Sequence, residues 1–214
     1  MASTPKLNRT QFDKIAKRFV SSNLTQGDLA IPYLIGDHII ASNSSSAVSI
    51  RMKRLNHPYI LMAEDASTKA MLERLVERLF TNFETDISLV VSRRIIRELV
   101  KFLKEVRRGY KKYEIKVEIS CDVNRGLRFI VKHLGDNTES FIQEYEVECE
   151  SEETTLYNDE HFTTTVSINH LIDAMLTLRE SDNESILNFQ IDPMSPMLFS
   201  NSSLQIILTP VRDI

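Results

Sequence analysis

The sequence predicts an α+β fold made of repeated units, each consisting of a strand, a helix and three further strands. Segments with helical and with strand periodicity alternate along the 214 residues, and only five glycines interrupt them. The order strand, helix, three strands occurs twice after residue 86, in units of roughly 60–70 residues. With 42% hydrophobic and 26% charged residues, the chain has enough apolar material for a packed core.

Four segments have the period of amphipathic helices. They are expected at Arg9–Val20 with Asn8 as N-cap, Thr68–Phe80 with Ser67, residues 93–108 with Ser92, and Ile168–Leu178 with Ser167. The third segment contains no Pro or Gly and is expected to end at Gly109. A short extended run precedes each of the last three helices: Tyr59–Met62, Asp86–Val90 and Phe162–Val166.

Segments with period-two alternation are expected to form strands. They are Leu29–Leu34, His38–Ala41, Ala47–Met52, Glu114–Ser120, Leu127–Lys132, Phe141–Cys149, Ser185–Ile191, Met197–Ser200 and Leu204–Leu208. We expect two domains with a boundary near Glu84–Asp86. Residues 1–85 form an abbreviated domain, in which residues 1–55 fit one unit, and residues 86–214 form a complete domain with two units.

No pattern in the sequence points to catalysis. Cys121 and Cys149 lie in strand-like sequence without a CxxC pair, which favours reduced structural thiols. The five histidines have no metal-ligand spacing, and no nucleotide-binding glycine motif is present. We therefore expect no metal, no cofactor and no enzymatic activity. Without a secretory signal or an apolar run of roughly 20 residues, a cytoplasmic chain with no membrane partner is expected.

Charge is distributed unevenly along the chain. The formal net charge is −4, yet residues 93–112 carry nine Lys or Arg and two Glu. Residues 133–178 contain no Lys or Arg, and acidic residues gather between Glu144 and Glu160. One basic helix on an acidic remainder predicts a surface oriented toward a polyanion, with the acidic segment facing elsewhere.

The basic helix divides into two faces at 100° per residue. The cations fall within an arc of roughly 140° opposite the apolar side, and they are Arg93, Arg94, Arg97, Lys101, Lys104, Arg107 and Arg108. Seven cations over about 24 Å of helix suit contacts with the phosphates of a duplex, which position a protein without reading sequence. The first helix adds Lys14, Lys17 and Arg18. A merely solvated basic face is the alternative, although such faces usually mix charges of both signs.

The C-terminal part of the chain resembles the bacterial polymerase III β subunit, a DNA sliding clamp. The resemblance covers roughly residues 86–212 and is carried by short motifs at Ile87–Arg94, Ile168–Leu176, Phe189–Phe199 and Leu204–Arg212. Thr209 departs from the family, which has Met before the terminal proline. The chain is also far shorter than the three-domain bacterial protomer, and it resembles in length the two-domain protomers of other clamps, which trimerise.

The resemblance implies a DNA-clamp-like fold, with antiparallel sheets on one side and helices on the other. It implies a homo-oligomer, with a trimer favoured, that encircles double-stranded DNA without sequence preference. It also implies a DNA polymerase and a clamp loader as partners, at a nucleoid or viral replication site. Carried over residue by residue, the pocket for a partner's peptide comprises Ile207, Thr209, Pro210 and Val211. A plain core strand is the alternative for that segment.

Three other functions stay open on the residues alone. A nucleic-acid-binding regulator could use the 93–112 helix without encircling DNA, and it would prefer particular sequences. A clamp-like scaffold without ring closure would only recruit proteins. An enzyme with a Cys or His nucleophile is the third alternative, but no spacing of catalytic groups supports it.

Overall fold

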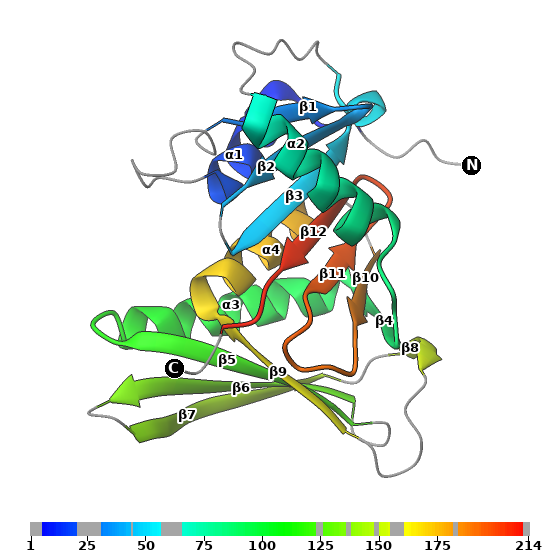
Figure 1. The fold of residues 1–214 in the computed structure, drawn as a ribbon. Helices are drawn as coiled ribbons and strands as arrows, with labels where there is room; N and C mark the ends of the chain where they lie inside the picture. Colours follow the sequence, from blue (N-terminus) through cyan, green and yellow to red (C-terminus); the bar gives the residue numbers. More distant parts are fainter. Residues whose placement is uncertain are drawn as a thin grey trace.

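Two antiparallel sheets, with three helices packed against their inner faces, make up the computed structural model of the chain (Figure 1). The structure describes residues 6–20, 31–43, 45–56, 66–122, 126–135, 138–147, 150–154, 161–181 and 184–211. The helices are α1 (Arg9–Phe19), the 3-10 turn η2 (Met52–Arg54), α2 (Ala66–Leu75) with its π-helical continuation η3 (Val76–Thr81), α3 (Arg93–Gly109) and α4 (Ile168–Ser181).

The strands form one sheet of eight and one of four. The first has the order β1-β2-β3-β12-β11-β10-β4-β8, and the second has the order β7-β6-β5-β9. Their bounds are β1 (Tyr33–Ile35), β2 (His38–Ser42), β3 (Ser46–Arg51), β4 (Ile87–Ser92), β5 (Glu114–Asp122), β6 (Gly126–Gly135), β7 (Thr138–Val147), β8 (Glu150–Thr154), β9 (His161–Ser167), β10 (Glu184–Phe189), β11 (Met197–Ser200) and β12 (Leu204–Leu208).

The two C-terminal units exchange their first strands. The unit β4-α3-β5-β6-β7 places β4 beside β10, whereas the unit β9-α4-β10-β11-β12 places β9 beside β5. Each helix therefore leads from one sheet to the other, and α3 and α4 pack side by side between the sheets. The predicted duplication is present, and each of the two units contributes its first strand to the sheet of the other unit.

The N-terminal residues form a third, reduced unit. Its helix α1 is followed by β1, β2 and β3, while its first strand is reduced to a single parallel bridge between Leu7 and Leu55. Strand β3 pairs with the whole of β12, for example Val48 with Ile206. The two predicted domains thus share one sheet, and a boundary near Glu84–Asp86 stays a prediction.

Opposite faces of the eight-stranded sheet are covered by different helices. One face, with Ile39 and Ile206, joins α1, α3, α4 and the inner face of the four-stranded sheet in the main core. The other face, with Ile40 and Ile207, forms a smaller core under Leu72 of α2 and Phe80 of η3. Figure 1 shows α2 in front of this sheet and α4 behind it. Three of the four predicted helices therefore share one face, and α2 does not.

Most of the predicted elements are present. The α+β class with antiparallel sheets and helices is confirmed, as are the four helices and the N-caps at Asn8 and Ser92. The edge strand β8 was not predicted. The predictions for Tyr59–Met62 and Cys149 lie outside the described residues. Among the described residues, no helix is both long and apolar enough to cross a membrane.

Candidate nucleic-acid interface

Helix α3 has the two faces that the sequence predicts. The Ser92 hydroxyl accepts a hydrogen bond from the Ile95 amide at 3.4 Å and so begins the helix. Its buried side chains are Ile96, Leu99, Val100, Phe102, Leu103 and Val106, which all face the main core. Because burial fixes the rotation of the helix, the cationic side is held toward solvent.

The cationic stripe consists of Arg93, Arg94, Arg97, Lys101, Lys104, Arg107 and Arg108. The side chains of Arg94, Arg97, Lys101 and Arg108 are exposed, and the other three are half-buried. No hydrogen bond or ion pair joins Arg97, Lys101 or Arg108 to another residue that the structure describes. These three cations are therefore the ones most available to an external anion.

Two members of the stripe are engaged within the protein. The Arg94 Nε atom donates to Glu98 at 3.0 Å, and this hydrogen bond raises the pKa of Arg94 and lowers the pKa of Glu98. The Arg107 Nε atom donates to Asn169 of α4 at 3.1 Å and ties the two helices together. Arg94 is therefore partly neutralised, while Arg107 is held in a fixed position.

Helix α1 lies beside α4 in the same layer and contributes the other predicted cations. Lys14 and Lys17 are exposed. Arg18, in contrast, forms a bidentate ion pair with Glu180 of α4, with a shortest distance of 2.8 Å, and donates to Thr177 at 3.1 Å. Only 17% of the Arg18 side chain is exposed, so it joins α1 to α4 and is poorly placed to contact DNA.

Helix α4 separates α1 from α3 and is not basic. Its outward residues include Asn169, His170 and Asp173. Burial lowers the pKa of His170, which keeps the imidazole neutral at pH 7. Burial also raises the pKa of Asp173, although the positive charges of Arg18 and Lys104 act in the opposite direction. Positive charge on this face is thus concentrated on α3, with a smaller contribution from α1.

No protein-family model matches the sequence, and the comparison with curated proteins finds no match. Solved structures are similar in fold. The polymerase β subunit of Streptococcus pyogenes superposes with a TM-score of 0.62 and 10% identity over 96% of this chain and 64% of its own. The β subunit of Thermotoga maritima DNA polymerase III superposes with a TM-score of 0.60 and 14% identity, over 100% of this chain and 68% of the β subunit.

A structure from a second group of proteins has a similar fold. The proliferating cellular nuclear antigen of Entamoeba histolytica superposes with a TM-score of 0.54 and 10% identity, over 94% of both chains. The chain has the sliding-clamp fold. It spans less than two thirds of the S. pyogenes subunit, and nearly the whole length of the antigen.

Within this clamp fold, the C-terminal strand is more buried than the predicted peptide pocket requires. Ile207 is only 2% exposed, because α2 and η3 cover it. Thr209 donates from its amide and its hydroxyl to the Ser45 carbonyl at 3.1 and 3.0 Å. The Val211 amide donates to Thr165 of β9 at 2.8 Å. Residues 209–211 therefore connect the two sheets, and only Thr209, Pro210 and Val211 remain half-exposed.

A groove with a mixed polar and apolar lining, which the sequence did not indicate, lies beside η3. It has a volume of about 950 Å³. Its apolar lining comes from Leu75, Leu79, Phe83 and Pro196, and the rest of its lining is polar or charged. Ile191 and Met194 do not line the groove, but they are exposed in the β10–β11 loop that contains Pro196. Periodicity could not reveal this groove, because it joins residues more than 100 positions apart.

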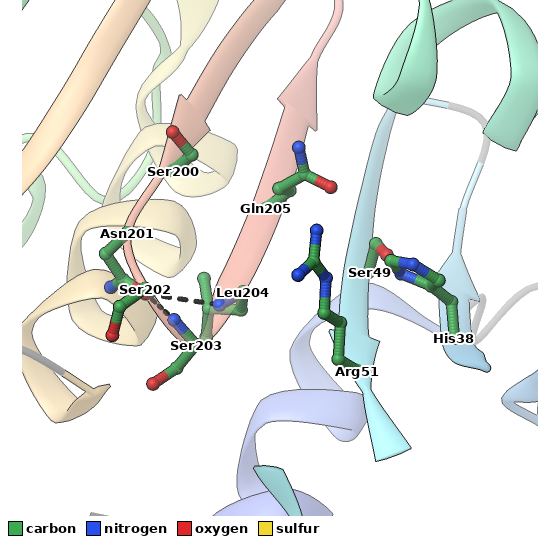
Figure 2. Close-up of a pocket in the computed structure, with 9 residues that line it drawn as sticks. All are labelled: His38, Ser49, Arg51, Ser200, Asn201, Ser202, Ser203, Leu204 and Gln205. Carbon is green, nitrogen blue, oxygen red and sulfur yellow. Dashed lines mark hydrogen bonds between the residues drawn. The ribbon is translucent and has the colours of Figure 1, made fainter. Parts of the chain in front are cut away.

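A smaller, polar cavity of about 220 Å³ lies on the same side of the eight-stranded sheet as η3. Figure 2 shows the Arg51 side chain between Gln205 of β12 and Ser49 of β3. The His38 Nδ1 atom lies 2.7 Å from the Ser49 hydroxyl, and burial lowers the pKa of His38. The cavity faces away from α3, so it is separate from the cationic stripe.

Proposed function

We propose that this chain is the subunit of a DNA sliding clamp, a non-enzymatic processivity factor that holds double-stranded DNA against its helix layer. The observation that carries the proposal is a row of exposed cations on α3, at Arg97, Lys101 and Arg108, which have no partner among the described residues and lie on the helix face of a clamp fold. Long flexible cations give weak phosphate contacts that are independent of sequence, as sliding requires. The cation at Lys104 and those at Lys14 and Lys17 extend this surface.

Ring assembly would use the open edges of the sheets. In the four-stranded sheet, β9 is partly covered by Val211, whereas the ten-residue strand β7 has no second neighbour among the described strands. An unpaired edge strand of that length is a template for pairing with another chain. We propose that β7 joins an edge strand of a second copy, in a homotrimer. Because α2 lies outside the helix layer, three copies would each supply the described helices α1, α3 and α4 to the inner face.

The polymerase tether is proposed to be the groove beside η3, with its four apolar lining residues. Ile207 is covered, so the site expected at the C-terminal strand retains only Thr209, Pro210 and Val211. The groove instead offers the apolar side chains of Leu79 and Phe83, and the exposed Met194 lies in the β10–β11 loop beside Pro196 of the lining. Replacing Ile191 and Met194 with Asp should shorten the products of the cognate polymerase on a primed template, without changing the affinity of the clamp for duplex DNA.

The test of the proposed function combines solution mass and duplex binding. Sedimentation should give about three times 24.7 kDa. Affinity for two duplexes of unrelated sequence should be equal and should fall steeply as salt increases, because binding releases counterions. A monomer at tens of micromolar with strong preference for one duplex would contradict the proposal and favour a regulator that does not encircle DNA.

A further inference from the structure

The segment that follows the basic helix combines positive charge with aromatic rings. Residues 107–113 contain the four cations Arg107, Arg108, Lys111 and Lys112, the two tyrosines Tyr110 and Tyr113, and no acidic residue. Arg107 and Arg108 also belong to the cationic stripe, so the segment continues it beyond the end of α3. Cations at a helix C-terminus stabilise the helix dipole, but that effect is confined to the last turn and does not account for the aromatic rings.

Three rings meet at this end of α3. Tyr110 stacks on His133 of β6 with 5.9 Å between ring centroids and 23° between planes. Tyr113 lies 5.0 Å from His133 and 6.3 Å from Tyr110, tilted against both. The turn is fixed by the Tyr113 amide, which donates to the Tyr110 carbonyl at 3.2 Å, and by the Arg107 Nη1 atom, which donates to the same carbonyl at 3.4 Å.

The outermost ring is held in place but left open to solvent. Tyr113 is 48% exposed, and Lys111 and Lys112 beside it are exposed. The pair of Tyr110 and His133 already closes this end of the core, since both side chains are half-buried. The Nδ1 atom of His133 is buried and has no hydrogen-bond partner within the described part of the chain. A half-exposed ring that packs on another ring and has cations beside it in the chain is the kind of arrangement by which proteins bind unstacked bases.

We propose that residues 107–113 form a binding site for single-stranded DNA, in which Tyr113 stacks on an unpaired base and Arg108, Lys111 and Lys112 contact the adjacent phosphates. This proposal rests on the proposed function only for the expected position of the single strand. If a duplex lies on the cationic stripe, a single-stranded extension of that duplex would reach this end of α3. Binding of a free single strand requires neither the ring nor the duplex. The site therefore favours junctions of duplex with single-stranded DNA over blunt duplex.

The test uses fluorescence anisotropy with three labelled probes: a thymidine 20-mer, a blunt 20-base-pair duplex, and the same duplex with a single-stranded extension. The substitution Tyr113→Ala should weaken binding of the 20-mer and of the extended duplex about tenfold, the size of one lost base stack. Binding of the blunt duplex should not change, because the charge of the protein is unaltered. The substitution Tyr113→Phe keeps the ring and should bind all three probes like the unsubstituted protein.

A second measurement reports stacking directly. The chain contains six Tyr and no Trp, so its intrinsic fluorescence comes from tyrosine. The 20-mer should quench this emission in the unsubstituted protein and quench it less in Tyr113→Phe, although both bind equally well. Equal affinity of Tyr113→Ala and the unsubstituted protein for the 20-mer would overturn the proposal, as would a matching loss for the blunt duplex. Neither result would affect the account of Arg97 and Lys101.

Discussion

Helices α3 and α4 occupy equivalent positions in two copies of the same structural unit, yet they present different surfaces. Each follows the first strand of its unit and packs against the other between the two sheets. Helix α3 turns a row of cations outward, whereas α4 is buried along most of its length and has no Lys or Arg before Arg179. The structural unit thus determines where each helix packs. The residues on the outward face of the helix determine whether it presents cations to an external anion or only stabilises the fold.

The largest expected effect comes from the core of α4. Leu171 is fully buried, so the substitution Leu171→Ala should lower the free energy of unfolding by about 2–5 kcal/mol through lost burial and the cavity left behind. Urea unfolding measures this change. Duplex affinity at low temperature, where the variant remains folded, should be unaltered. A loss of DNA binding by the folded variant would mean that α4 contributes directly to the interface.

Charge reversal on α3 should weaken DNA binding and leave stability almost unchanged, the opposite of Leu171→Ala. Replacing both Arg97 and Lys101 with Glu should weaken duplex binding by roughly two orders of magnitude and make it less dependent on salt, because two phosphate contacts become repulsive. The free energy of unfolding should change little, since both side chains are exposed. The matched control replaces Arg74 and Arg78 with Glu on α2 and η3, which cover the opposite face of the sheet. Equal losses in the two variants would show that only net charge matters.

Arg18 and Lys17 lie side by side in the predicted interface, and we expect Arg18 to stabilise the fold and Lys17 to contact DNA. The substitution Arg18→Ala removes a bidentate contact with Glu180 and should lower the free energy of unfolding by about 1–3 kcal/mol. The neighbouring exposed residue serves as control, since Lys17→Ala should change stability by less than about 0.5 kcal/mol. Thermal unfolding compares the two. If Lys17→Ala weakens duplex binding more than Arg18→Ala does, the assignment of the two roles holds, and the reverse order would contradict it.

The smallest expected effect concerns His170 on α4. Burial lowers its pKa, so the folded protein binds a proton there less tightly than the unfolded chain. The free energy of unfolding should therefore fall as the pH decreases through about 6.5. The stability that comes from burying the neutral imidazole is fully present above that pH. Urea unfolding at pH 7.5 and 5.5 should show a smaller difference for His170→Gln than for the unsubstituted protein. An unchanged difference would mean that other groups set the pH dependence.

Local features of the chain were predictable because they depend on neighbouring residues. The N-caps at Asn8 and Ser92, the two faces of α3 and most strands follow from periodicity and capping within short windows. The sequence could not show that β3 pairs with β12, because those strands are about 150 residues apart. For the same reason it could not show that Glu180 neutralises Arg18 or that α2 covers Ile207. The last two contacts determine how far the predicted site residues Arg18 and Ile207 are exposed.

The accessibility of the DNA ends tests most directly whether DNA passes through a ring, as we propose. One linear duplex keeps both ends open, and an otherwise identical duplex has both ends blocked by streptavidin before the protein is added. We expect retention on the open duplex, loss of retention when the ends are blocked beforehand, and a longer residence when they are blocked after binding. Equal retention on both duplexes would contradict this expectation and would show that the α3 stripe binds DNA from one side only.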